Sequence, residues 1–398
     1  MNSAFKFFNI FGIAILGTFV ILCTNGLTIS GITAFDTTLI EEFSWTKSEL
    51  KFRDFLNLVC AAAIVPFVGI LIDKYGVKKV MSFGLILLTM LIYSYSYIES
   101  YIHMYFIHVG FAFAVASAGT MPVIIMVSQR VKEMRGTALG IALAGTSLGG
   151  LLISKLAVYL LNNYGWRMSF RYEAILPIIA LILVLVFLKP INYSNKDKNA
   201  KTGLTEIGFL QAIKSSTFWA ICGAGFFCFY SVLGIIGNMF LYLSELGYSP
   251  EKASTMFGAL FIIILSAKFS SGFLTEFIPK YLLFRLQLCL MLLGAIFLSI
   301  NTTQFAWPAI IAVGFGWGGL YTLFNYVIIT TFGVKNAGKI NGIISTFESI
   351  GGGLGIWMTG LISDKTGSYT ASFYVVIAFL FTSLIISIFI KPVIADEN

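Results

Sequence analysis

The sequence predicts an all-α integral membrane protein in which about twelve transmembrane helices form two pseudo-symmetric six-helix bundles. The composition is the first observation: 58% of the 398 residues are hydrophobic and 11% are charged, whereas soluble domains contain roughly 25% charged residues. So few polar groups do not cover a water-facing surface. The second observation is that the apolar residues gather in runs of the length that crosses a bilayer, about 20 residues. The third is that motifs of the first half of the chain recur in the second half.

Twelve apolar segments follow one another along the chain, each bounded by polar or charged residues. In order they cover residues 11–35, 53–72, 79–98, 101–127, 136–161, 170–188, 217–243, 253–274, 281–300, 305–330, 339–362 and 370–390. The first segment is too long for the apolar core of a signal peptide, so we expect an uncleaved first span.

The loops that follow the even-numbered segments carry an excess of positive charge. Their basic residues are Lys74, Lys78, Lys79, Arg130, Lys132, Arg135, Lys189, Lys196, Lys198, Lys201 and Lys214. The opposite side carries acids with fewer cations, namely Asp36, Glu41, Glu42, Glu49, Glu99 and Glu245. Basic loops stay on the cytoplasmic side, so we expect both termini in the cytoplasm and the chain in the cell inner (plasma) membrane. The net charge of +8 is then a signal of membrane topology, and we expect no nucleic-acid partner.

One extended polar stretch divides the chain near its middle. It begins at Lys189 and reads KPINYSNKDKNAKTGLTE. We therefore predict an N-terminal bundle over residues 1–190, a cytoplasmic linker over 191–214 and a C-terminal bundle over 215–398.

The two predicted bundles share motifs at a nearly constant spacing. Residues 69–79 read GILIDKYGVKK and residues 272–280 read GFLTEFIPK, so that Gly-x-Leu-x-acid recurs after 203 residues. Residues 140–150 read GIALAGTSLGG and residues 342–352 read GIISTFESIGG, an offset of 202. Two matches at almost one offset indicate an internal duplication. Paired six-span halves are typical of transporters, whose binding site lies near the bilayer midplane between the repeats.

Helix starts support the same alignment. Thr46 and Glu49 have the spacing of a capping box at the start of the second span. Ser249, again 203 residues later, precedes Pro250, and this order is typical of an N-cap followed by the first helical residue.

Over its whole length the chain resembles a major facilitator superfamily transporter. The stretch 69–79 is similar to the loop motif of that family between spans two and three, Gly-x-Leu-x-Asp-basic-x-Gly-basic-basic, with Val77 interrupting the second basic pair. The alternative is a charged turn that only enforces topology. The resemblance implies that Asp73 gates the cytoplasmic side by meeting the start of span eleven and Arg135. The gating residues expected in this way are Gly69, Asp73, Gly76, Lys78, Lys79, Arg135, Gly272 and Glu276.

Two further stretches narrow the resemblance to the monocarboxylate and oxalate–formate antiporter branch. They are EEFSWTKSEL before span two and TTFGVKNAGKINGIISTFESIGGGLGIWMTGLISDKTGSY around spans ten and eleven. The branch implies a carboxylate-binding basic residue at Lys268, where it usually has arginine. The chain departs from the branch at Ile264, where an acid is common, and in its first span, which has no lysine.

Charges inside the apolar spans are the candidate functional residues. At the repeat offsets Lys268 stands opposite Val65 and Glu348 opposite Thr146, so each charge belongs to one half only. Glu348 lies about nine residues into its span, roughly 14 Å along a helix, close to the midplane. We expect Lys268 to bind a substrate carboxylate and Glu348 to carry the coupling proton or to pair with Lys268 in the empty site. The alternative is that Lys268 only neutralises Glu348 or Glu276.

Polar and aromatic residues of spans seven and ten are candidates for shaping the pocket, although aromatic residues in apolar spans are more often packing. They are Tyr230, Asn238, Tyr321 and Asn325, with Tyr326 beside them. Lys155 is expected at the rim of span five, and Arg53 with Asp54 as a gate or a local ion pair. Arg167, Arg171 and Glu173 are expected at the membrane interface, and structural or interfacial roles are expected for His103 and His108.

The sequence does not predict a metal, phosphate or dinucleotide site. The five cysteines form no Cys-x-x-Cys pair, so we expect no metal site. GVKNAGKI, from Gly333, lacks the Ser or Thr of a phosphate-binding loop. GFGWGG, from Gly314, lies in an apolar run where glycines let helices approach closely. We therefore expect neither an enzyme nor a cofactor.

The predicted function is secondary active transport of a small organic anion, a mono- or dicarboxylate, by alternating access with proton coupling. The expected partners are the carboxylate substrate, protons and the lipid bilayer, and the expected state is a monomer. The alternatives are a carrier of amino acids or other zwitterions and a drug or siderophore exporter of the same fold.

Overall fold

The computed structural model describes residues 3–131, 134–189, 208–332 and 337–391, and the side chains of residues 3–10 and 337–339 are left out of the description. These ranges are almost entirely helical and contain no β-strand. Most of the predicted linker, including Lys196, Lys198 and Lys201, lies outside the described residues, as do Lys132 and the beginning of the GVKNAGKI motif.

Contacts between residues divide the chain into two compact units. Unit 1 contains Met1–Ile191 and Met239–Ile262, and unit 2 contains Asn192–Asn238 and Ile263–Asn398. The contacts thus group the stretch Met239–Ile262 with the N-terminal part of the chain. The predicted boundaries at residues 190 and 215 stay a prediction.

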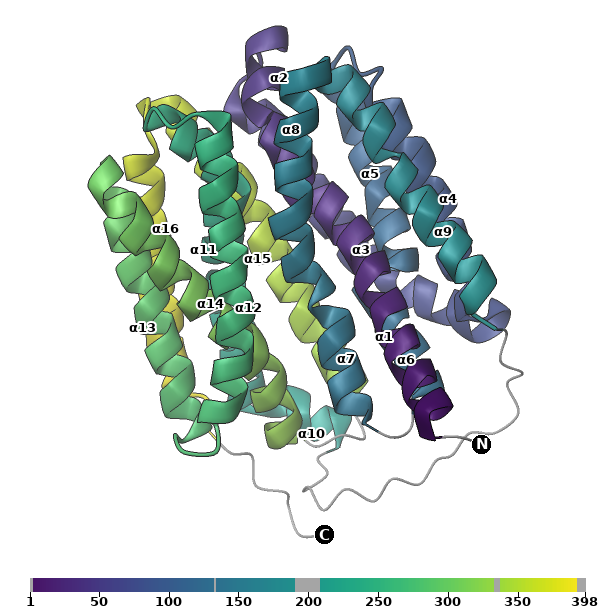
Figure 1. Cartoon of the computed structure of the whole chain (residues 1–398). Helices are drawn as coiled ribbons and strands as arrows, with labels where there is room; N and C mark the ends of the chain where they lie inside the picture. Colours follow the sequence, from purple (N-terminus) through teal and green to yellow (C-terminus); the bar gives the residue numbers. More distant parts are fainter. Residues whose placement is uncertain (1–2, 132–133, 190–207, 333–336, 392–398) are drawn as a thin grey trace. The chain divides into compact units, whose positions relative to one another are not determined.

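Unit 1 begins with an interrupted first span and continues with helices of 8 to 29 residues. Its elements are α1 (Ser3–Asn25), η1 (Gly26–Gly31), η2 (Ile32–Phe35), α2 (Asp36–Phe43), α3 (Lys47–Tyr75), α4 (Val77–Tyr95), α5 (Tyr101–Ala118), α6 (Thr120–Arg130), α7 (Arg135–Leu143), α8 (Gly145–Glu173) and α9 (Ile175–Phe187). Helix α1 packs against α7 and α8, α3 packs against α5, and α4 lies alongside α5 and α9 (Figure 1).

Unit 2 consists mainly of long helices. The elements of the second half of the chain are α10 (Phe209–Lys214), α11 (Ser216–Glu245), α12 (Pro250–Leu274), α13 (Lys280–Ser299), α14 (Thr303–Phe332), α15 (Ala337–Thr366) and α16 (Tyr369–Ser387). Helix α13 packs against α14 and α16, and α15 packs against α16.

Among the described residues, ten helical stretches are long and apolar enough to cross a membrane. One of them, Arg135–Phe187, contains two predicted spans, because Gly165 breaks the helix with a φ of 71°. The 30-residue helix α15 is not among the ten but corresponds to the predicted span 339–362. Each predicted span therefore has a helical counterpart, and the predicted fold class is confirmed.

The predicted helix starts of α3 and α12 are present. Thr46 Oγ1 accepts from the Glu49 amide at 3.2 Å, and the Glu49 carboxylate accepts from the Thr46 amide at 2.8 Å, which completes the capping box. Ser249 Oγ accepts from the Lys252 amide at 3.3 Å, one turn into α12.

The first span is not the single regular helix that the sequence predicts for residues 11–35. A π-helical turn at Gly26–Gly31 and a 3₁₀ turn interrupt it, and the helical chain then continues to Phe43. A Cβ on Gly26 would collide with Ile153 and approach the backbone of Gly149 in α8, so close packing of small residues accompanies the irregular turn. This path brings Asp36 into the core of unit 1, where it is fully buried.

Candidate functional site

Lys268 lies on α12 of unit 2 and faces an aromatic ring. Its ammonium group is 4.5 Å from the centroid of the Tyr321 ring of α14, a cation–π contact. Its backbone carbonyl accepts a hydrogen bond from Thr322 Oγ1 at 3.3 Å. The lysine is half-buried rather than extended into solvent.

The glycines of GFGWGG explain why α14 reaches Lys268. A Cβ on Gly318 would collide with the Ile264 carbonyl and with Ala267 of α12, and a Cβ on Gly319 would collide with the side chain of Gln287 in α13. Only glycine allows this approach, which confirms the predicted packing role of the motif. The approach places Tyr321 one turn further along α14, over Lys268.

Other aromatic side chains hold the Tyr321 ring. Trp317 packs edge-on against it, with ring centroids 5.7 Å apart. Phe229 of α11 packs in the same way against Trp317 at 5.0 Å. Such edge-to-face pairs add stability beyond the buried area, so the surface offered to Lys268 is supported from α11.

Glu348 lies on α15 and is also half-buried. Its Cγ is next to Gly225 of α11: a Cβ on that glycine would stand 3.2 Å from Glu348 Cγ and 3.6 Å from Phe324 Cε1. Gly225 therefore borders both Glu348 and Phe324 of α14, the helix that carries Tyr321. We take Lys268, Tyr321 and Glu348 as the candidate site of unit 2.

The other pocket candidates do not join this group in the same way. Asn325 is exposed and donates to the Tyr321 carbonyl of its own helix at 3.1 Å. Tyr230 is buried, and its ring packs against Phe379 of α16 at 4.5 Å. Their roles in binding stay predictions.

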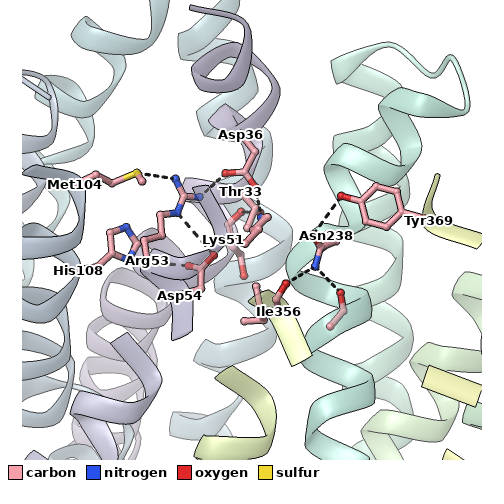
Figure 2. A network of polar contacts seen from close by, with 12 residues as sticks. Thr33, Asp36, Lys51, Arg53, Asp54, Met104, His108, Asn238, Ile356 and Tyr369 are labelled. Carbon is pink, nitrogen blue, oxygen red and sulfur yellow. Dashed lines mark hydrogen bonds and ion pairs between the residues drawn. The ribbon is translucent and has the colours of Figure 1, made fainter. Parts of the chain in front are cut away.

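Asn238 has its hydrogen bonds satisfied by protein groups. Its Nδ2 donates to the carbonyls of Gly234 and Ile356 at 2.9 and 3.0 Å, and its Oδ1 accepts from the Tyr369 hydroxyl at 3.2 Å (Figure 2). With 1% of its surface exposed, this amide joins α11 to α15 and α16.

The residues of the expected gating motif occupy the junction of α3 and α4. Gly76 has a φ of +84°, a conformation that L side chains rarely adopt, and its amide donates to the Ile72 carbonyl at 2.8 Å. Lys78 donates to the Leu185 carbonyl of α9 at 2.8 Å. Asp73 and Lys79 are exposed, as is Arg135 at the start of α7, and the expected contacts of Asp73 stay predictions.

The second copy of this motif has a different local structure. Helix α12 ends at Leu274, and Glu276 lies exposed in the turn before α13. A Cβ on Gly272 would meet open space, whereas one on Gly69 would touch Met121 at 3.5 Å. The two copies of the motif therefore share their place at the end of a helix, but their glycines have different neighbours.

The structure contains a buried charged cluster in unit 1 that the sequence interpretation missed. It consists of Asp36, Lys51, Arg53, Asp54, Tyr95 and His108. The Asp36 carboxylate contacts both Lys51 and Arg53, and Arg53 Nε lies 3.7 Å from Asp54 Oδ2 (Figure 2). The predicted local pair of Arg53 with Asp54 is confirmed. The sequence does place three charges, Lys51, Arg53 and Asp54, within two turns of α3, and this spacing was the available sign of a buried cluster.

Glu173 and Arg167, both expected at the membrane interface, differ in their exposure. Glu173 is 1% exposed and its Oε1 has no hydrogen-bond partner among the described residues, so its carboxyl is packed inside the protein, and its expected depth at the membrane interface stays a prediction. Arg167 does reach the surface, where it pairs with Glu42 and stacks on Trp166 at 4.1 Å.

Comparison with known sequences gives consistent matches over most of the chain. A family model described as Major Facilitator Superfamily matches residues 14–356. The chain is 28% identical to Monocarboxylate transporter 13 of Rattus norvegicus over 327 residues, 79% of this chain and 73% of the relative. It is 24% identical to Monocarboxylate transporter 11 of Mus musculus, over 86% of this chain and 78% of the relative. It is 22% identical to the agnestins efflux protein AgnL12 of Paecilomyces divaricatus, over 94% and 86%.

Solved structures match over nearly the whole length. A bacterial homolog of the human lysosomal transporter Spinster, solved in an inward-facing and occupied conformation, aligns with a TM-score of 0.74 at 15% sequence identity. The alignment covers 98% of this chain and 95% of that one. At this identity the match establishes the fold.

Proposed function

The chain belongs to the major facilitator superfamily, and we propose from this premise that its cargo is a small organic anion carried by Lys268. The family and the fold make it a multi-pass membrane transporter and not an enzyme, and the sequence resemblance is confirmed.

The observation that carries the proposal is the position of Lys268. A lysine at the centre of a membrane helix costs about 2.5–3.5 kcal/mol on insertion scales. The cation–π contact with the Tyr321 ring returns about 0.5–2 kcal/mol. A bound carboxylate would neutralise the ammonium group directly. Two of the relatives described above are named monocarboxylate transporters, which supports this substrate class.

Glu348 is the proposed proton carrier. A half-buried carboxyl beside apolar rings and glycine backbone is costly in its charged form, and taking up a proton removes that cost. Lys268 and Glu348 both belong to unit 2, on helices α12 and α15 that border α14, and a proton on Glu348 would change the charge of the site in which Lys268 holds its substrate. The proposal includes alternating access, a plasma-membrane location with cytoplasmic termini, and a monomeric state.

A second candidate function is export of a larger metabolite. The relative from Paecilomyces divaricatus is named an efflux protein and is matched over 94% of this chain. A zwitterion carrier would use Lys268 and Glu348 together.

Ligand binding and uptake separate these candidates. Purified protein is screened by thermal shift against carboxylates, amino acids and sugars, and compounds that stabilise it are tested for uptake into proteoliposomes. We expect carboxylates to stabilise the unaltered protein and a Lys252→Ala control, whose lysine is exposed on the same helix, but not Lys268→Ala. Stabilisation by carboxylates in Lys268→Ala would contradict the proposal.

A further inference from the structure

Four side chains of unit 1, Arg53, Tyr95, His108 and Asp54, close a ring of polar contacts, and Figure 2 shows Arg53, Asp54 and His108. Arg53 donates to the Tyr95 hydroxyl at 2.9 Å, and this hydroxyl lies 3.4 Å from His108 Nε2. His108 Nδ1 is 4.0 Å from Asp54 Oδ1, and Asp54 Oδ2 is 3.7 Å from Arg53 Nε. The ring joins α3, α4 and α5 and is nearly closed to solvent, with Arg53, Tyr95 and His108 fully buried and Asp54 at 9% exposure.

The half of the ring around Asp54 lacks hydrogen bonds. Arg53 Nε, Asp54 Oδ2 and His108 Nδ1 are buried without a hydrogen-bond partner among the described residues. The separations of 3.7 and 4.0 Å are too long for hydrogen bonds. A purely structural cluster would be expected to satisfy these atoms, because leaving them unpaired costs free energy.

The two carboxylates of the cluster, Asp36 and Asp54, differ in how closely the cations Lys51 and Arg53 approach them. Asp36 of α2 contacts both Lys51 and Arg53 directly, whereas Asp54 Oδ2 lies 3.7 Å from Arg53 Nε. With both aspartates ionised and His108 neutral, the four charges of the cluster sum to zero, and one added proton gives a charge of +1. Asp54 is the carboxylate that gains most from this proton, because its ionised form has the weaker partner.

The remaining groups around the ring offer no competing acid. On α5, the Tyr105 hydroxyl donates to the Glu49 carbonyl at 2.6 Å, and Met104 Sδ lies 3.7 Å from Arg53. On α8, Phe170 packs against the Tyr95 ring at 4.5 Å. The proton-accepting atoms of the ring are therefore those of Asp54 and His108.

The fold itself does not require charges at these positions. At the repeat offset of 203, Arg53 and Asp54 correspond to Met256 and Phe257 of α12. Both are fully buried. The matching helix thus packs with apolar side chains, and the charges of α3 belong to one half only.

We propose that Asp54 and His108 form a proton-binding site in unit 1, separate from Glu348. In the deprotonated state His108 carries its hydrogen on Nδ1, the nitrogen that faces the ionised Asp54 carboxylate, while Tyr95 donates to Nε2. Uptake of one proton leaves the Asp54 carboxyl protonated and facing Nδ1, while His108 carries its hydrogen on Nε2 and donates to the Tyr95 oxygen. One proton is gained, the imidazole of His108 is neutral in both states, and the cluster goes from a net charge of zero to +1. The proton gradient would then act on a second site besides Glu348.

The chain has two histidines, so the exposed one, His103, can be removed to make His108 the only reporter. His103→Gln protein with nitrogen-15 histidine is reconstituted in liposomes, and nitrogen resonances are followed from alkaline to acidic pH. We expect the hydrogen of His108 to move from Nδ1 to Nε2 on acidification. We expect this change to be lost in Asp54→Asn and to persist in Glu348→Gln. Asp54→Ser serves as a second carboxyl-free variant if Asp54→Asn does not fold.

Three results would overturn the assignment. They are a single histidine form over the whole pH range, the same change in a folded protein without the Asp54 carboxyl, and protonation of both ring nitrogens of His108. Loss of the change in Glu348→Gln would show that the two sites are not separate. The readout needs no substrate, so its failure is distinct from failure of the proposed transport function.

Discussion

At the scale of the residue, Lys268 keeps the positive charge that the monocarboxylate branch usually supplies with arginine but lacks the planar guanidinium fork. A carboxylate can therefore be held by charge and one hydrogen bond at a time rather than by two parallel bonds. The Tyr321 ring below the ammonium group limits the directions from which a substrate approaches.

Replacing Lys268 measures its contribution to binding. A hydrogen bond to a charged group contributes on the order of 1.5–3 kcal/mol, so Lys268→Ala should weaken substrate binding roughly 10- to 100-fold. Lys268→Arg should retain much of the affinity because the charge remains. Isothermal titration with a carboxylate identified by the thermal-shift screen provides the measurement.

The double variant Lys268→Ala, Glu348→Gln tests the alternative that Lys268 only neutralises Glu348. In that case the single Lys268→Ala change destabilises the protein, and the double variant restores folding and binding because no unpaired buried charge remains. Full substrate binding by a folded double variant would show that Lys268 does not bind the substrate.

Tyr321 can be tested independently of charge. Tyr321→Phe keeps the aromatic face, whereas Tyr321→Leu removes it, with a loss of about 0.5–2 kcal/mol of cation–π attraction. If the ring positions Lys268, substrate binding by Tyr321→Leu should weaken roughly 2- to 30-fold, and Tyr321→Phe should remain close to the unaltered protein. Equal substrate affinities of Tyr321→Leu and Tyr321→Phe would show that the aromatic ring does not contribute to substrate binding.

At the scale of the element, the features predicted from sequence are those whose causes lie within one turn of helix. The Thr46 capping box and the Ser249 N-cap are local patterns, and both are present. Asn238 was predicted as a pocket residue because it is polar in an apolar span. Its actual partners, Ile356 and Tyr369, lie on helices that only the tertiary fold brings near.

The buried ring was not predicted for the same reason. Arg53 and Tyr95 are 42 residues apart and lie on different helices. Asp36 reaches Arg53 only because the first span continues through a π-helical turn. No local sequence motif predicted this turn. The charges were visible in the sequence, but their pairing depends on the tertiary fold.

The approach of α14 to α12 gives a prediction at this scale. Gly318→Ala places a methyl group against the Ile264 carbonyl, and overpacking of this kind costs about 1–3 kcal/mol. We expect a lower thermal midpoint and weaker carboxylate binding, because Tyr321 moves with α14. Gly342→Ala is the matched control, since a Cβ there meets no atom within 4 Å. Equal midpoints for the two variants would show that the close approach is not required.

At the scale of the whole molecule, the proposed cytoplasmic gate at Asp73 and the proposed proton site at Glu348 would act in one transport cycle. Asp73→Asn removes the acid of the gating motif, which an N-terminal helix end and Arg135 would otherwise attract. We expect transport in proteoliposomes to slow while the binding constant for substrate changes less. Transport rates equal to those of the unaltered protein would contradict the gating role.

Proton coupling belongs to the same scale because it appears only when a gradient drives a complete cycle. If Glu348 carries the proton, Glu348→Gln keeps the size of the side chain but has no proton to take up or release. Accumulation of substrate under an inward proton gradient should be lost, whereas exchange of internal for external substrate, which needs no net proton movement, should continue. Both are measured with the same labelled carboxylate in the same proteoliposomes, so the exchange reaction controls for folding and insertion. Should Glu348→Gln still concentrate substrate against its gradient, the proton is carried elsewhere, and the Asp54–His108 pair becomes the first site to test, with Asp54→Asn in the same two assays.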